Sequence, residues 1–197
     1  MSEKNTKERI LEAAESIILE ESFHSVGINQ ILTAVGVPKG SFYHYFPSKE
    51  AFGTEMIRHY ASRENQQRRR ILRNSDPEKN PIQRLLTFFE SSIVRIRESG
   101  GKCPCLMQKL ATEVSNFSDA MREELSKGFA DLIEIFKETL DEAVAENLLP
   151  ADLDTEAEAT FIMDLWAGAQ QRTIITRTAA PTQRAVEVFR ERLTGSR

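Results

Sequence analysis

The sequence predicts an all-α fold of about nine helices, and three observations support this. Apolar residues recur every three or four positions along most of the 197-residue chain, which is the spacing that gives a helix one buried face. No stretch alternates apolar and polar residues in the period-2 pattern of a strand. Neither Asn-Gly nor Asp-Gly, the dipeptides that favour tight hairpin turns, occurs in the chain.

Three short helices are expected before Pro47, and local residues define their ends. Asn5 followed by Glu8 is a capping-box pattern that begins the first helix. Gly36 ends the second, because glycine adopts the left-handed cap conformation at little cost, and Pro38 suits the first turn of the third. Two short helices joined by a tight glycine turn form a helix-turn-helix. The apolar residues of the first two helices are Ile10, Leu11, Ala14, Ile17, Ile18, Ile28, Ile31, Leu32 and Val35.

Six longer helices are expected after this segment. Ser48 caps the fourth helix, and the loop NSDPEKNP follows it with two prolines. The acidic residues that come soon after Ser118 favour the N-terminus of a long helix. The expected ranges are 48–72, 82–98, 104–114, 118–144, 154–178 and 181–193.

The charges of the chain are unevenly distributed. The formal net charge is −4, yet residues 1–75 carry 11 Lys and Arg against 9 Asp and Glu. Residues 22–49 contain no Asp or Glu at all. A surface that meets phosphates excludes carboxylates, because like charges repel and the gain from counterion release is lost. This segment therefore predicts a nucleic-acid contact.

Several classes of protein do not fit the sequence. No run approaches the 18 apolar residues of a membrane span, and the charged start MSEKNTKERI is unlike a signal peptide, so we predict a cytoplasmic protein without a membrane partner. Cys103 and Cys105 are the only cysteines, and their spacing suits neither a mutual disulfide nor a zinc site. No metal and no cofactor are predicted.

The stretch GVPKGSFYHYFPSK places four aromatic residues and a histidine in a helix of about two turns. On a helical wheel, Phe42, Tyr45 and Phe46 group on one side, where they complete the core. Tyr43 and His44 face the other way together with Gly40, beside Lys39. Tyr, His and Lys side chains can bind phosphate oxygens or base edges. The alternative is an aromatic mini-core with ordinary surface residues.

The segment GVPKGSFYHYFPSKEAF resembles the signature of TetR-type transcriptional regulators. The resemblance implies an all-helical homodimer that binds a palindromic double-stranded DNA operator. It also implies a helix-turn-helix DNA-binding domain at residues 1–50 and a helical ligand-sensing and dimerisation domain at residues 51–197. In place of a Ser or Thr that the family often has near Gly27, Ser25 or Asn29 is expected to substitute. The implied DNA-binding residues are Ser25, Asn29, Lys39, Gly40, Ser41, Tyr43, His44, Tyr45 and Lys49.

The resemblance also implies a dimer interface and a ligand pocket in the larger region. Small residues let helices of two copies approach closely, although the same residues could form an intramolecular core. Aromatic and Met side chains of the middle helices are expected to line the pocket in part, with polar groups from a later helix. The interface residues are Phe161, Leu165, Gly168, Ala169, Val186, Phe189 and Leu193. The pocket residues are Phe89, Phe117, Met121, Phe129, Trp166, Gln170 and Arg172.

The segment GGKCPCLMQKLATEVS suggests a thiol sensor. Pro104 suits the first turn of a helix, which would place Cys105 in that turn, where helix N–H groups favour a thiolate. Together with PKGSFYHYF, this segment resembles the NemR-like branch of the family, which responds to electrophiles and oxidants. That resemblance implies a sensor role for Cys105 and, second to it, for Cys103. The alternative is that the cysteine is a small buried hydrophobe.

The sequence therefore predicts a transcriptional repressor, not an enzyme, that a small molecule or a reactive electrophile releases from its operator. A helical enzyme with Cys105 as nucleophile is one alternative, but no histidine lies at a recognisable spacing from it. A non-specific architectural DNA-binding protein is another, but the acidic net charge of −4 argues against it.

Overall fold

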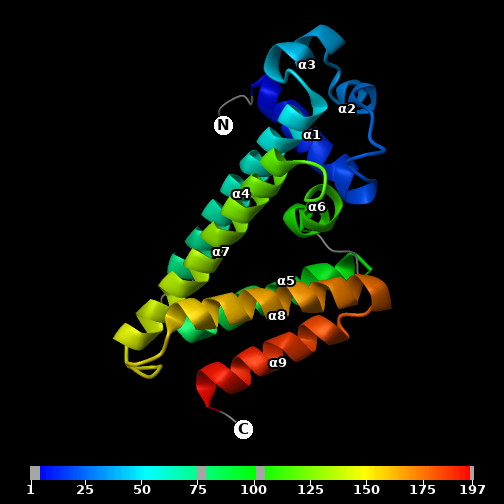
Figure 1. Cartoon of the computed structure of the whole chain (residues 1–197). Coiled ribbons are helices and arrows are strands. Elements are labelled where there is room, and N and C mark those ends of the chain that lie inside the picture. Colours follow the sequence, from blue (N-terminus) through cyan, green and yellow to red (C-terminus); the bar gives the residue numbers. More distant parts are fainter. Residues whose placement is uncertain (1–4, 75–78, 101–104, 196–197) are drawn as a thin grey trace. The chain divides into compact units, whose positions relative to one another are not determined.

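The computed structural model describes residues 5–74, 79–100 and 105–195, and in these ranges it contains nine α-helices and no strand (Figure 1). The predicted all-α fold of about nine helices is thus confirmed. The helices are α1 (Thr6–Glu20), α2 (Ile28–Val35), α3 (Lys39–Tyr45), α4 (Lys49–Asn74), α5 (Pro81–Glu98), α6 (Leu106–Val114), α7 (Asp119–Ala145), α8 (Thr155–Thr176) and α9 (Ala180–Thr194).

Local residues define the helix ends, as the sequence predicts. The side chain of Asn5 accepts a hydrogen bond from the Glu8 N–H at 2.9 Å, and the Glu8 carboxylate accepts from the Asn5 N–H at 3.2 Å. Gly36 ends α2 with φ 65° and ψ 35°, in the left-handed region. The Ser48 hydroxyl accepts from the Ala51 N–H at 3.0 Å at the start of α4. These caps satisfy N–H groups that have no partner inside the helix.

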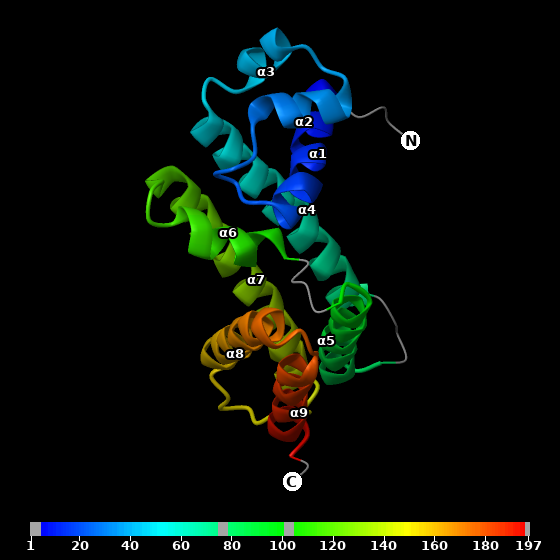
Figure 2. The same ribbon diagram turned by 90° about the vertical axis from the view of Figure 1, so that its right-hand side faces the viewer.

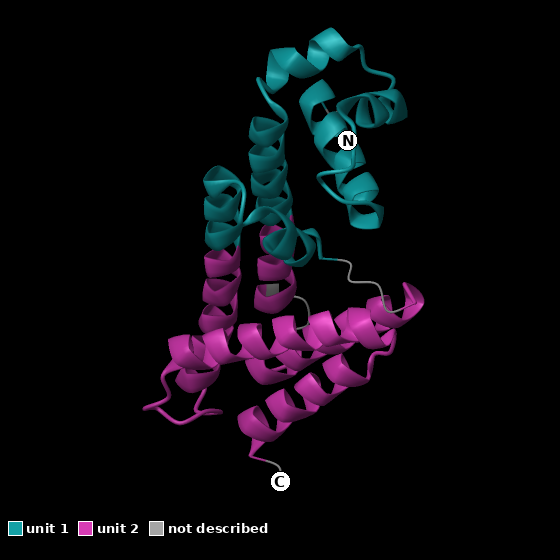
Figure 3. Ribbon diagram, turned by 45° about the vertical axis from the view of Figure 1, so that its right-hand side comes forward, with its two compact units in different colours: residues 1–63, 105–128 teal, residues 64–104, 129–197 magenta. Residues whose placement is uncertain are grey.

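The chain forms two compact units, which Figure 3 shows in different colours. Unit 1 comprises residues 1–63 and 105–128, and unit 2 comprises residues 64–104 and 129–197. Helices α4 and α7 contribute residues to both units. The expected domains, residues 1–50 for DNA binding and residues 51–197 for sensing and dimerisation, are defined by function. The packing of the helices does not test a functional division, so it stays a prediction.

Unit 1 groups the helix-turn-helix with α1, α6 and the first part of α4 (Figure 2). Its core includes Phe42, Phe46 and Phe52, each at most 1% exposed. The ring of Phe42 lies 5.1 Å from that of Phe46 and 5.3 Å from that of Phe52, which are ordinary distances for tilted aromatic pairs. This cluster attaches α3 to the start of α4.

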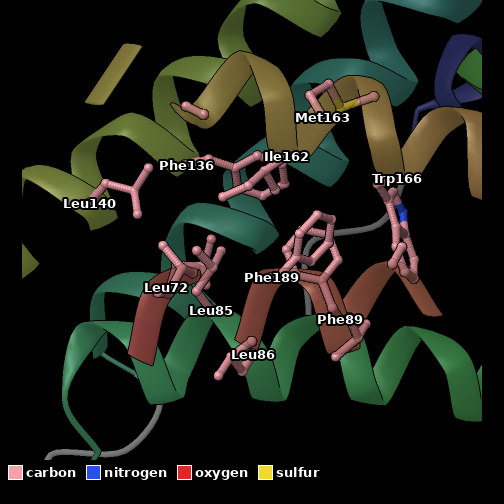
Figure 4. Packing of buried hydrophobic residues seen from close by; sticks show 14 of the residues in the cluster. Leu72, Leu85, Leu86, Phe89, Phe136, Leu140, Ile162, Met163, Trp166 and Phe189 are labelled. Carbon is pink, nitrogen blue, oxygen red and sulfur yellow. The ribbon is translucent and has the colours of Figure 1, made fainter. Parts of the chain in front are cut away.

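Unit 2 has an aromatic core built around Phe89, which is completely buried (Figure 4). Its ring centroid lies 4.8 Å from that of Trp166, 4.9 Å from that of Phe189 and 5.4 Å from that of Phe136. These three partners come from α8, α9 and α7, so one side chain of α5 contacts three other helices of unit 2. Phe89 is therefore a core residue of unit 2, and its role in a ligand pocket stays a prediction.

Four residues expected at the dimer interface are buried inside a single chain. Ala169, Val186, Phe189 and Leu193 are at most 7% exposed and belong to the core of unit 2. Helix α9 packs against both α5 and α8, so residues of the same chain cover its apolar face. In the single chain these four residues are part of the intramolecular core, which was the alternative, and their place at an interface between two copies stays a prediction.

Two kinds of feature, a membrane-spanning helix and a group of metal ligands, are absent from the described residues. No helix among them is both long enough and apolar enough to span a membrane. Nor do the described ranges contain three or more His, Cys, Asp or Glu residues grouped as metal ligands.

We expect Phe89→Ala to lower the free energy of unfolding by about 3–5 kcal/mol, because it removes a buried ring from the centre of unit 2. Val94→Ala, on an exposed position of the same helix, should change it by less than about 0.5 kcal/mol. Urea unfolding checks this at one fixed protein concentration, because self-association makes apparent stability depend on concentration. Equal losses in the two variants would contradict a core centred on Phe89.

Candidate functional site

Helix α3 has one buried and one exposed side. Phe42 is completely buried, whereas Tyr43 is 49% exposed and His44 is also exposed. Tyr45 was expected in the core, but it is 39% exposed. The helix ends at Tyr45, and Phe46 has extended backbone angles (φ −134°, ψ 108°) that turn its ring into the core instead. Three neighbouring aromatic or imidazole rings therefore face outward.

Polar groups suited to DNA surround these rings. Lys39 and Gly40 are exposed at the start of α3, and Ser41 is half-buried. No atom lies within 4 Å of the position that a Cβ would take at Gly40, so another molecule can approach the backbone closely. A shallow groove between α2 and α3 adjoins them, and it contains no acidic residue. It is lined by Asn29, Leu32, Thr33, Gly36, Val37, Pro38 and Lys39.

Two of the expected DNA-binding residues are engaged within the protein. The Lys49 ammonium donates to the carbonyls of Val26 at 2.7 Å and His24 at 3.0 Å. Burial lowers the pKa of Lys49, and nearby Glu113 partly offsets this effect. The Ser25 hydroxyl donates to the Ser22 carbonyl at 3.1 Å. Both side chains hold the loop before α2, and their contact with DNA stays a prediction.

Helix α6 is bonded to the region before the helix-turn-helix, a feature that sequence reasoning missed. Lys109 donates to the carbonyl of Leu19 at 2.9 Å and to that of Glu21, at the C-terminus of α1. Glu113 accepts a hydrogen bond from the His24 N–H at 3.0 Å. The partners lie about ninety residues apart in the chain, so no local pattern could indicate these contacts.

Cys105 lies immediately before α6 rather than in its first turn. It is the N-cap residue, with extended backbone angles (φ −94°, ψ 108°), and it is half-buried. The Leu106 N–H that follows donates to the Tyr60 hydroxyl at 3.3 Å. The helix therefore begins at Leu106, two residues after the expected start at position 104. Cys103 lies outside the described residues.

The expected pocket residues are divided between the two units. Phe117 and Met121 belong to unit 1, where Phe117 is 46% exposed and its ring lies 4.2 Å from that of His24. Met121 is completely buried there. The remaining residues belong to unit 2, in which Trp166 and Gln170 are buried, Phe129 is partly buried and Arg172 is exposed. Their roles in sensing stay predictions.

Unit 2 also contains a cavity of about 190 Å³ between the end of α4 and one face of α5. None of the expected pocket residues lines it. Arg84, Thr87, Ser91 and Arg95 follow one another at intervals of three, four and four residues, so helical spacing in the sequence could have indicated this face. The cavity is lined by Ile71, Lys79, Arg84, Thr87, Phe88, Ser91 and Arg95.

Comparisons with known proteins match both parts of the chain. Residues 10–56 match the family model described as bacterial regulatory proteins, tetR family. Residues 81–189 match the model described as tetracyclin repressor-like, C-terminal domain.

Relatives are similar over nearly their whole length. The HTH-type transcriptional repressor NemR of Escherichia coli (strain K12) is 32% identical, and the match covers 94% of this chain and 92% of NemR. The HTH-type transcriptional repressor DhaR of Mycobacterium sp. (strain GP1) is 29% identical over 98% of this chain and 94% of DhaR. The crystal structure of reduced E. coli NemR matches with a TM-score of 0.85 and 29% identity, covering 95% of this chain and 96% of that one. The chain therefore belongs to the TetR family of bacterial transcriptional regulators.

Proposed function

We propose that this regulator is a repressor that binds a palindromic operator as a homodimer and leaves it when a reactive electrophile or other small molecule acts on it. The observation that carries the proposal is the outward face of α3, where Tyr43, His44 and Tyr45 are exposed within a segment free of acidic residues. The activity would take place in the cytoplasm, where bacterial DNA lies.

DNA binding would follow the usual helix-turn-helix geometry, in which the second helix of the motif enters the major groove. Helix α3 would place the rings of Tyr43 and His44 against base edges or sugars. Lys39, at the first position of α3, would contact a phosphate. The Phe42–Phe52 contact (5.3 Å between ring centroids) supports this role, because it holds the buried side of α3 in place. The opposite side, the reading face with Tyr43 and His44, stays exposed.

A strip along α8 supports self-association. Phe161, Leu165, Gly168, Arg172 and Ile175 follow one another at intervals of four, three, four and three residues, which is the spacing of a helix–helix seam. Ile175 is 79% exposed and Phe161 is 38% exposed, so the strip presents apolar surface to solvent. Nothing lies within 4 Å of a Cβ placed at Gly168. A second copy that pairs along this strip would remove the apolar surface from water.

Release would begin at Cys105. Addition of its thiolate to an electrophile would enlarge a half-buried residue at the start of α6. Lys109 and Glu113 on α6 bind the end of α1 and the loop that follows, so a displacement of α6 would reach the DNA-binding segment within unit 1. An inducer can act only through its preference for the released state over the bound state. The relative NemR, whose solved structure is described as the reduced form, supports a thiol-based signal.

The enzyme alternative has less support than the regulator. The relatives NemR and DhaR are both described as transcriptional repressors. Cys105 is the residue that either hypothesis would use, so its variants distinguish them: a sensor changes DNA binding, whereas a nucleophile would turn over a substrate.

We expect Tyr43→Ala to weaken operator binding by about 1–3 kcal/mol, because it removes an exposed ring from the reading face of α3. Fluorescence anisotropy with an operator fragment from DNA flanking the gene, at one salt concentration, measures the change. Tyr43→Phe, which keeps the ring and loses the hydroxyl, separates ring contacts from hydrogen bonding. An unchanged affinity of Tyr43→Ala, with an unchanged melting temperature, would remove this residue from the interface.

We expect N-ethylmaleimide to release the wild-type protein and Cys103→Ser from the operator, and to leave Cys105→Ser bound. The reason is that a serine hydroxyl does not add to the maleimide double bond under conditions in which a thiolate does. A gel shift with and without the reagent checks this. Equal release of Cys105→Ser and the wild type would refute sensing at this residue.

We expect Ile175→Glu to convert the dimer to a monomer at micromolar concentration, because it places a carboxylate in the apolar strip of α8. Val94→Glu alters another exposed aliphatic residue, on α5, and should remain dimeric. Sedimentation velocity measures both variants. If Ile175→Glu sediments as the wild-type dimer does, the strip is not the interface.

A further inference from the structure

We infer that the cavity between the end of α4 and α5 is a binding site for a small organic carboxylate. The cavity lies in unit 2 and measures about 190 Å³. It shares no residue with the reading face, with the strip of α8 or with the Cys105 region, so the inference goes beyond the proposed function.

The cavity gathers positive charge on an acidic protein. Among the described residues, its lining includes Lys79, Arg84 and Arg95 and neither Asp nor Glu, although the whole chain has a formal net charge of −4. A concave surface lined by charges of one sign raises the local concentration of ions of the opposite sign. Because Arg84 pairs with Glu142, Arg95 is the group of this lining that would attract an anion.

Arg84 forms a fixed part of the cavity lining and is not the group that would bind the carboxylate. It is 7% exposed, and its guanidinium donates to the Leu72 carbonyl at 2.6 Å and to the Lys79 carbonyl at 2.9 Å. Its remaining contact is an ion pair with Glu142. These bonds attach the end of α4 and the segment before α5 to one rigid side chain.

Arg95 provides the binding group. One guanidinium nitrogen donates to the Ser92 hydroxyl at 2.9 Å, and that hydroxyl donates to the Phe88 carbonyl at 3.0 Å, so the side chain is held by a buried anchor. Within the described part of the chain, no carboxylate pairs with Arg95. A guanidinium has five N–H donors in a planar fork, which suits the two oxygens of a carboxylate.

The remaining residues complete a site for an acid with an apolar body. Ser91, one helical turn before Arg95, and Thr87 before it bring hydroxyl groups to the same face of α5. Ile71 and Phe88 supply apolar surface. The Phe88 ring is held against Phe89 at 5.2 Å between centroids, so this surface is preformed. An inorganic anion would leave the apolar surface of Ile71 and Phe88 without an apolar group to contact.

Isothermal titration of the full-length protein with benzoate tests the inference. Wild type should bind benzoate with a Kd of about 1 mM, which corresponds to about −4 kcal/mol. Benzamide, which has the same ring and no charge, and inorganic phosphate, which has charge and no ring, should each bind at least about tenfold more weakly, because each lacks one of the two contacts.

Two variants on α5 locate the site. Arg95→Gln should weaken benzoate binding at least about tenfold, because it removes the charged fork. Arg97→Gln removes the same charge from an exposed residue of the same helix that does not line the cavity, and should match the wild type. An unchanged melting temperature of Arg95→Gln without ligand shows that the fold is intact.

Four outcomes would overturn the inference: no benzoate binding by the wild type, equal binding of benzamide, equal binding of phosphate, or equal losses in the two variants. Each shows that the cavity does not select an organic carboxylate. The titration contains no DNA, so its failure leaves the repressor proposal intact. Loss of operator binding by Tyr43→Ala, conversely, says nothing about this cavity.

Discussion

The exposed face of α3 depends on aromatic packing, the contacts of Phe42 with Phe46 and with Phe52. Helix α3 has only seven residues, which is too short for a helix to be stable alone in water. Its position therefore comes from the burial of Phe42 and of Phe46, which follows the helix. Because these rings face inward, Tyr43 and its neighbours face outward. The same short segment thus supplies both the buried anchor and the exposed surface that is proposed to contact DNA.

Hydrogen bonds from charged side chains position the segments around this anchor. Lys49 holds the loop before α2 through two carbonyls, and Lys109 binds the carbonyl groups at the end of α1. Those carbonyls have no partner inside their helix, so a cation is a favourable ligand for them. A protein that changes its affinity for DNA needs such contacts, because a few exchangeable bonds can be rearranged more easily than a packed aromatic core.

Helix α8 shows how one element can serve two surfaces. Its buried side carries Met163, Trp166 and Ala169 in the core of unit 2, and its other side carries Phe161 and Ile175 toward solvent. A helix that is apolar on both sides is usually covered on both sides. The single chain covers only one of them, which is the physical basis for proposing a second copy. On α5, the face next to the core stripe bears Arg84 and Arg95 and lines the cavity.

The sequence by itself determined the helical class, the capped helix ends at Asn5 and Gly36 and the outward face of α3 at Tyr43 and His44. These features depend on caps, turns and spacings within a few residues, as Asn5 and Gly36 illustrate. Only the tertiary structure decided which apolar faces are covered. Phe189 contacts Phe89, one hundred residues away, and so belongs to the core of unit 2. Contacts between distant residues depend on how helices pack, and packing leaves no periodic pattern in the sequence.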